Sequence, residues 1–139
     1  MPIDYRQVDG GLGNVITASG VVTEEEFIGF YTDFFSQDEK SLANYRFGLS
    51  DYSAVTELHV NVDSVKRVVV MSTRTASIIP DTLVAICAPQ TYAYGLARMW
   101  EIFLDVSNWE TRVFKDRDEA VSWLRKRAKE KYRIAIIDL

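Results

Sequence analysis

Residues 82–104 read TLVAICAPQTYAYGLARMWEIFL. The run Thr82–Ala88 is almost wholly apolar, which is typical of a parallel strand that is covered on both faces. Pro89 interrupts this run, and over Thr91–Ser107 the apolar residues recur at helical spacing. A buried strand followed directly by an amphipathic helix predicts the repeating unit of an α/β fold.

The segments on both sides of this stretch continue the alternation of strands and helices. Thr23 with Glu26 forms the capping pattern of a helix whose aromatic stripe runs to Phe35. Asp63 is the expected N-cap of another helix, and residues 55–62 are ambiguous. The other predicted elements are the strands Ile3–Val8, Asn14–Val22, Tyr45–Asp51 and Glu110–Phe114, and the helices 63–77 and 116–129.

The predicted order of elements is therefore β-β-α-β-α-β-α-β-α. An opening hairpin followed by strand-helix units with right-handed crossovers predicts a mixed, mostly parallel five-stranded sheet with four helices. We expect one domain over residues 1–139, with its core at about 3–130. Residues 132–139 are an extension in which a further strand could pair with the sheet or with another subunit.

The composition is that of a folded protein. Of the 139 residues, 47% are hydrophobic and 26% are charged, which excludes a disordered chain. Cys87 is the single cysteine, so no internal disulfide can form, and this fits a reducing cytoplasm. The longest uncharged stretch, residues 82–97, is too short for a bilayer and contains Pro89, so we expect no transmembrane segment.

The charge pattern argues against nucleic acid as a partner. The net charge is −4, whereas binding to a phosphate backbone needs a surplus of basic side chains. The basic side chains gather instead in residues 125–133, near the end of the last predicted helix. These cations either form a solvated helix end that offsets the helix dipole or meet an anionic membrane surface or acidic partner.

Two stretches resemble a known family. Residues 84–89 (VAICAP) with 94–101 (YGLARMWE), and residues 112–124 (RVFKDRDEAVSWL), are similar to the small bacterial SpoIIAA-like (STAS/CRAL-TRIO-like) proteins. With the matching order of elements, the resemblance covers roughly residues 3–127. It implies a STAS-like fold, and its wider superfamily implies anti-sigma-factor antagonists, transporter regulatory domains and, more remotely, lipid carriers.

The antagonist branch implies a phosphorylated serine in an Asp-Ser-Ser-Gly segment at the start of the second helix. The matching residues here are Asp63, Ser64, Val65 and Lys66, which keep one hydroxyl but lack the second serine and the glycine. We therefore expect Ser64 to be a residue of the first helical turn rather than a phosphorylation site.

The helix that begins at Thr91 carries more apolar surface than a sheet needs to cover it. Its apolar side chains span an arc of roughly 220°, whereas a stripe of about 100° suffices for packing on a core. The surplus meets a neighbouring helix, a second subunit or protein partner, or an apolar ligand. Gly95 within it indicates a close approach of the helix to the sheet, or space for a ligand. The candidate binding residues of this helix are Tyr92, Tyr94, Leu96, Arg98, Met99, Trp100 and Phe103.

A second group of candidates lies in the loops at the carboxyl ends of the parallel strands, where ligands gather in open α/β sheets. These loops supply Asp51, Ser53, Gln90 and Thr91. Acidic and hydroxyl side chains in such loops more commonly form turns by bonding to the backbone. We also expect Arg98 to form surface ion pairs, with anion binding as the alternative.

Recognisable catalytic and metal-binding motifs are missing from the sequence. His59 is the sole histidine, it has no serine elbow nearby, and neither it nor Cys87 stands at metal-ligand spacing. We expect no cofactor and a non-enzymatic regulatory or protein-interaction module. Its expected partner is another protein or a second copy of the chain in a homodimer. The alternative is a carrier of a small apolar or lipid-like ligand, held between the 91–107 helix and the aromatic 27–35 helix.

Overall fold

The computed structural model describes residues 2–79, 81–104 and 108–139, and across these ranges it forms one five-stranded sheet and five α-helices. The sheet order is β1-β2-β3-β4-β5. The first pair is antiparallel and every later pair is parallel, as predicted. The strands are β1 (Ile3–Val8), β2 (Gly13–Val22), β3 (Phe47–Leu58), β4 (Leu83–Cys87) and β5 (Glu110–Phe114), and the helices are α1 (Glu24–Phe34), α2 (Glu39–Ala43), α3 (Val62–Ala76), α4 (Thr91–Phe103) and α5 (Arg117–Tyr132).

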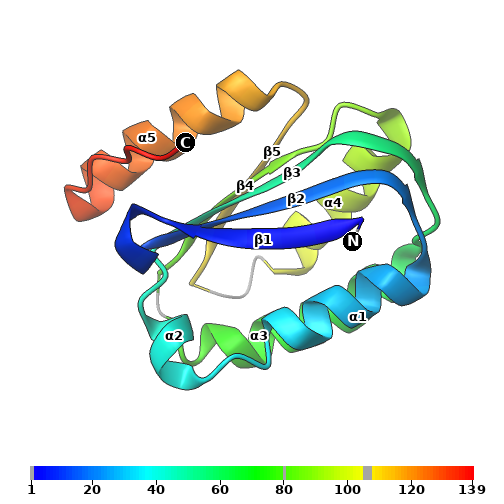
Figure 1. The fold of residues 1–139 in the computed structure, drawn as a ribbon, viewed down its shortest axis with the longest axis horizontal. Coiled ribbons are helices and arrows are strands. Elements are labelled where there is room, and N and C mark those ends of the chain that lie inside the picture. Colours follow the sequence, from blue (N-terminus) through cyan, green and yellow to red (C-terminus); the bar gives the residue numbers. More distant parts are fainter. Residues whose placement is uncertain (1, 80, 105–107) are drawn as a thin grey trace.

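The helices cover the two faces of the sheet unequally. From β2 to β5 the chain always moves to the next strand in the same direction, so right-handed crossovers put α1, α3 and α4 on one face. The helix α5 follows the last strand and covers the opposite face (Figure 1). The buried apolar side chains accordingly divide into a large core under α1, α3 and α4 and a second core under α5.

The starts of the helices follow the predicted capping chemistry with one correction. The hydroxyl of Thr23 accepts a hydrogen bond from the backbone N–H of Glu26, whose carboxylate in turn accepts from the Thr23 backbone, so this capping box is confirmed. Asp63 is not the N-cap of α3. Asn61 caps that helix, because its side chain accepts from the backbone N–H of Ser64 at 3.0 Å and completes a reciprocal box.

Two elements differ from the sequence prediction. The short helix α2 was not expected; it is capped by Asp38 and has five residues, too few for an apolar period to be visible. The ambiguous segment after residue 54 continues β3 to Leu58, where it pairs with the end of β2. The predicted 91–107 helix is observed as Thr91–Phe103, and residues 105–107 lie outside the described residues.

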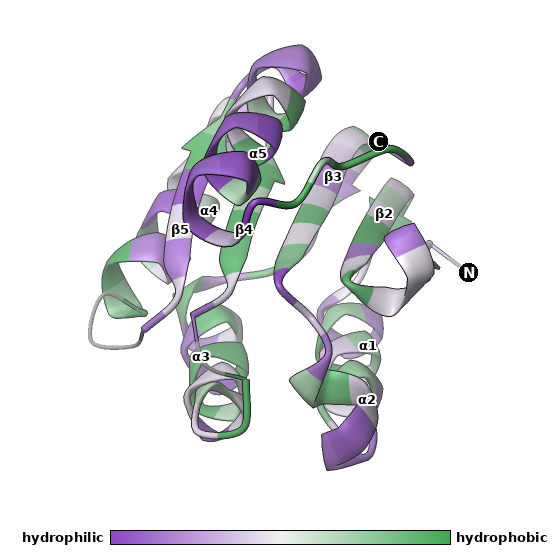
Figure 2. Ribbon diagram, turned by 90° about the vertical axis from the view of Figure 1, so that its left-hand side faces the viewer, coloured by the Kyte–Doolittle hydropathy of each residue, from purple (hydrophilic) through white to green (hydrophobic). Residues whose placement is uncertain are grey.

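The C-terminal extension does not form a strand. The helix α5 ends at Tyr132, and Arg133 takes a left-handed conformation with φ of 57°. Beyond it the carboxylate of Asp9 accepts hydrogen bonds from the backbone N–H groups of Ile137 and Asp138, at 3.2 and 3.1 Å. Figure 2 shows this tail on the α5 side of the sheet, where Ile136 is buried in the second core. The Asp9 side chain and the burial of Ile136 therefore hold the tail in place, and not the backbone hydrogen bonds of an added strand.

Candidate functional site

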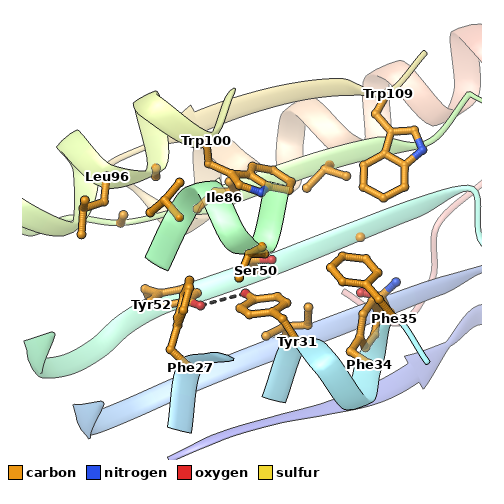
Figure 3. A pocket seen from close by; sticks show the side chains of 18 of the residues that line it. Phe27, Tyr31, Phe34, Phe35, Ser50, Tyr52, Ile86, Leu96, Trp100 and Trp109 are labelled. Atoms are coloured by element: carbon orange, nitrogen blue, oxygen red, sulfur yellow. Dashed lines mark hydrogen bonds between the residues drawn. The ribbon is translucent and has the colours of Figure 1, made fainter. Parts of the chain in front are cut away.

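A cavity of about 110 Å³ lies between the sheet and the helices α1, α3 and α4 (Figure 3). The aromatic side chains of α1 form one wall, and Leu96, Ala97 and Trp100 of α4 contribute to the opposite wall. The strands β3 and β4 form the floor through alternate residues, among them Ser50, Tyr52 and Ile86. Because side chains alternate along a strand, the residues between these point toward α5.

The aromatic stripe of α1 builds its wall from residues one helical turn apart. Phe27, Tyr31 and Phe34 are buried and recur at spacings of four and three. The rings of Phe27 and Tyr31 meet edge to face, with 5.0 Å between their centroids. The facing positions include Ala88, directly after β4, and Ala97 of α4, whose short side chains leave the space between the layers unfilled.

A pair of tyrosines puts polar atoms into this apolar space. The hydroxyl oxygens of Tyr31 and Tyr52 lie 2.8 Å apart in a buried hydrogen bond, and Ser50 lies beside them (Figure 3). Burial raises the pKa of Tyr31 to about 12 and raises that of Tyr52 well above its ordinary value of 10. Both phenols are therefore neutral at physiological pH.

Two further polar atoms at the cavity have no hydrogen-bond partner among the described residues. These atoms are the indole Nε1 of Trp100 and the hydroxyl of Thr82, and both are shielded from solvent. Trp109, which also lines the cavity, differs from Trp100, because its Nε1 donates to the carbonyl of Ile79 at 3.1 Å. A buried donor without an acceptor costs about 1–3 kcal/mol, so such groups are rare in a core that has no ligand to receive them.

The structure divides the predicted residues of α4 between the cavity and the surface. Leu96 and Trp100 line the cavity, and Phe103 packs against the same core. Tyr92 is 57% exposed and Met99 38% exposed. The remaining two candidates of this helix are Tyr94, half-buried with the Lys115 ammonium 5.0 Å from its ring centroid, and Arg98, paired with Glu101.

Gly95 does not have the role that was expected. It is exposed, and a Cβ built on it would meet no described atom within 4 Å outside its own stretch of helix. The glycine therefore serves neither a close approach of α4 to the sheet nor the cavity. The expectation was wrong because periodicity gives the position of a residue along a helix but not the distance to its neighbours.

The predicted cluster at the carboxyl ends of the strands lies apart from the cavity. Asp51 points to the α5 side, where its carboxylate is 3.2 Å from Nε of Arg117 and accepts from the backbone N–H of Ser53. The side chain of Gln90 donates to the carbonyl of Val55. Thr91 is the exposed first residue of α4. Asp51 and Ser53 therefore lie within β3 rather than in a loop at its end, because this strand continues to Leu58. Both residues and Gln90 make structural contacts and do not line the cavity.

Ser64 and the basic run have structural partners. Ser64 is fully buried in the capping box with Asn61, where a protein kinase could reach its hydroxyl only by opening the start of α3. Arg127 makes two hydrogen bonds to the Glu110 carboxylate, at 2.7 and 2.8 Å, and lowers the pKa of that group. Lys131 lies 3.8 Å from the same carboxylate, so part of the basic run ties α5 to β5.

The described residues away from the cavity form no recognisable metal or catalytic cluster. No cluster of three metal-ligating side chains occurs among the described residues. His59 is exposed and 3.2 Å from the Glu57 carboxylate. Cys87 is buried under α5, and burial raises the pKa of its thiol to about 11. The sequence predicted an apolar ligand against the aromatic helix that contains Tyr31, but Tyr52 and Thr82 were missed as cavity residues. The alternation of Ser50 and Tyr52 along β3 was the available signal for Tyr52.

Comparisons with known proteins identify the fold. No family model matches the chain, and no curated protein matches it. The structure is similar to the crystal structure of an uncharacterized protein of the DUF3478 family with a SpoIIAA-like fold, from Shewanella loihica PV-4. The two chains share 18% sequence identity with a TM-score of 0.52, and the match covers 88% of this chain and 91% of the other. The fold is therefore SpoIIAA-like, as the sequence resemblance implied.

One further prediction concerns membranes. Among the described residues, no helix has the length and apolar character needed to cross a bilayer. The most apolar helix, α4, has 13 residues and carries Arg98 and Glu101.

Proposed function

We propose that this chain is a non-enzymatic cytoplasmic module that binds a small apolar ligand in the cavity between the sheet and α1, α3 and α4. The observation that carries the proposal is a cavity of about 110 Å³ whose walls are apolar but whose lining includes unpaired polar atoms. Cores are normally packed without voids larger than a water molecule. A void of this size has a stability cost that ligand binding would offset.

The size of the cavity limits the ligand to about one ring. An engineered cavity of roughly 150 Å³ in another protein holds benzene, so about 110 Å³ suits a molecule of similar size once the walls adjust slightly. A phospholipid or a long acyl chain is too large. The proposed ligand is therefore smaller than the lipids that the wider superfamily suggests.

The chemistry of the lining supports binding without turnover. A general base must be able to accept a proton near neutral pH. The titratable groups of the cavity are tyrosines, and Tyr31 and Tyr52 keep their protons at that pH because burial raises their pKa. Neither phenol can act as a base, and neither can serve as a phenolate nucleophile.

Native mass spectrometry of freshly purified full-length protein tests the proposal directly, because it reports a bound small molecule and the number of subunits together. Ethylbenzene added to the protein gives a second test through thermal unfolding. At a free concentration of 100 times Kd, a ligand that binds only the folded state raises the free energy of unfolding by about 2.7 kcal/mol.

A matched control separates the cavity from non-specific uptake. Ile102 is 60% exposed on the outer face of α4, so Ile102→Ser should bind ethylbenzene as the wild type does. If neither ethylbenzene nor acetophenone raises the midpoint of unfolding, and the native mass equals that of the chain alone, the proposed function is ruled out.

The outer face of α4 favours a second candidate function, recognition of a protein partner or a second copy of the chain. Tyr92, Met99 and Ile102 are 57%, 38% and 60% exposed and stand seven and three residues apart, so they share one side of the helix. Light scattering after size exclusion, over a hundredfold range of concentration, tests the homodimer. A monomer at every concentration would contradict it, and loss of a dimer in Ile102→Ser would support it.

A further inference from the structure

We infer that the ligand of this cavity is a neutral, single-ring aromatic compound with a hydrogen-bond-accepting oxygen, and that the indole N–H of Trp100 donates to that oxygen. The inference rests on the proposed function and deepens it, because it names the chemical class that the cavity would select. It follows from three properties of the described lining, which are its charge, its hydrogen-bond donors and its walls.

The lining excludes an ionised ligand. None of the described residues around the cavity is an aspartate, glutamate, lysine, arginine or histidine. A carboxylate or ammonium group inside it would lose its hydration without gaining an opposite charge, at a cost far above that of a neutral polar group. A ligand that enters this space is therefore uncharged.

The lining offers more hydrogen-bond donors than it satisfies. Trp100 Nε1–H can only donate, and it has no acceptor among the described residues. The Thr82 side chain, in a residue that is 5% exposed, has a hydroxyl that also lacks a partner. The hydroxyls of Tyr31 and Tyr52, by contrast, bond to each other, and Ser50 is a further hydrogen-bond partner of Tyr31. An oxygen that accepts, such as a carbonyl, complements this set better than a hydrocarbon does.

The walls suit a flat ring. Figure 3 shows the indole of Trp100 on one wall and the ring of Tyr31 on the opposite wall, with Ser50 near the tyrosine. Aromatic rings favour offset-stacked or edge-to-face neighbours, and these two walls offer such positions to a third ring. Trp100, Tyr31 and Tyr52 all line the cavity, so their polar atoms are placed to orient the ring of a bound ligand.

The test compares three probes of similar size, acetophenone, ethylbenzene and benzoate, on the full-length protein. Acetophenone carries the carbonyl, ethylbenzene lacks it, and benzoate carries a charge. The measured quantity is the ratio of the ethylbenzene Kd to the acetophenone Kd, from calorimetric titration. Trp100→Phe keeps an aromatic ring but removes the N–H, so we expect this ratio to fall about tenfold in the variant.

Trp123→Phe is the matched control, because Trp123 packs in the core under α5 on the other face of the sheet. That variant should keep the wild-type ratio. A direct measurement complements the variants, since the three tryptophan indole N–H signals can be followed separately by ¹⁵N NMR. On addition of acetophenone the signal of Trp100 should move further than those of Trp109 and Trp123, whether or not Trp100→Phe folds.

The outcomes distinguish the inference from the function on which it rests. If Trp100→Phe weakens both neutral probes equally and the Trp100 signal does not move most, the assigned hydrogen bond is wrong while the cavity remains a binding site. Benzoate binding as tightly as acetophenone would overturn the neutrality of the ligand. If neither neutral probe binds, the proposed function itself fails.

Discussion

Substitution of Ala97 by leucine should fill the cavity from the α4 wall. Ala97 lines the cavity and is half-buried on the same helix as Leu96 and Trp100. Leucine adds three carbon atoms and has a helix propensity close to that of alanine, so α4 itself should be little affected. The variant should therefore be more stable than the wild type and should no longer bind an aromatic probe.

The expected gain can be worked from the volume. At about 24 cal/mol per Å³, a cavity of 110 Å³ corresponds to about 2.6 kcal/mol of lost stability. Burying three carbons at about 0.8 kcal/mol each gives about 2.4 kcal/mol, which agrees with that ceiling. Ordering the leucine side chain costs about 0.5–1 kcal/mol. We expect the free energy of unfolding to rise by about 1–2 kcal/mol.

Urea denaturation measures this gain, provided that the slope m is the same for both proteins. Ala128→Leu is the matched control, because Ala128 is fully buried on α5 in the second core. There the larger side chain has no space to enter and should destabilise the protein by about 1–3 kcal/mol. If Ala97→Leu destabilises the protein as much as Ala128→Leu does, or leaves ethylbenzene binding intact, the assigned space beside α4 is wrong.

Three further predictions follow from the described contacts. Gly95→Ala should raise the free energy of unfolding by about 1 kcal/mol in urea denaturation, because Gly95 is an exposed residue within the helix α4. Gly20→Ala should lower the free energy of unfolding, because Gly20 has a φ of 66° that alanine rarely adopts. The contribution of Tyr31 and Tyr52 to stability should be constant below pH 9 and fall as the pH rises from 10 toward 12, because burial raises their pKa in the folded state. The fall should be about 1.4 kcal/mol per pH unit for each tyrosine that ionises only when unfolded, and Tyr31→Phe should reduce that slope in a pH series of urea denaturation. Glu110→Gln should lower the free energy of unfolding by up to about 1 kcal/mol at pH 7, because it removes the ion pair with Arg127. The difference between the variant and the wild type should shrink below pH 4, because Arg127 lowers the pKa of Glu110 and the wild type loses the ion pair only when that carboxylate takes up a proton.

Most of the fold could be predicted from the sequence because its signals are local. The apolar run of β4, the capping box at Thr23 and the turn after Val8 each depend on residues that are close together in the chain. The order of these elements then leaves few arrangements, since crossovers are right-handed. The helix α2 and the tail after Arg133 could not be predicted, because a five-residue helix shows no period and the tail is held by the distant Asp9.

The candidate site could be predicted only in part. The surplus apolar surface of α4 pointed to Leu96 and Trp100, which line the cavity, because a helix with a wide apolar arc must meet something besides the sheet. The void itself depends on small residues, such as Ala88 and Ala97, facing the large rings of α1 across the layers. No spacing in the sequence expresses that pairing. The same limit applies to Gly95, for which the sequence indicated a close approach to the sheet or space for a ligand and the structure shows neither.

The apolar circumference of α4 therefore resolves into two separate surfaces. Leu96 and Trp100, one turn apart, face the cavity, while Met99 and Ile102 face solvent on another side of the helix. Groups that share no contacts contribute independently to stability and binding. Ligand uptake and association with a partner are then separable properties of one helix, and a substitution on either side reports on one of them alone. An effect of Ile102→Ser on probe affinity would show instead that the two surfaces act through a movement of α4 as a whole.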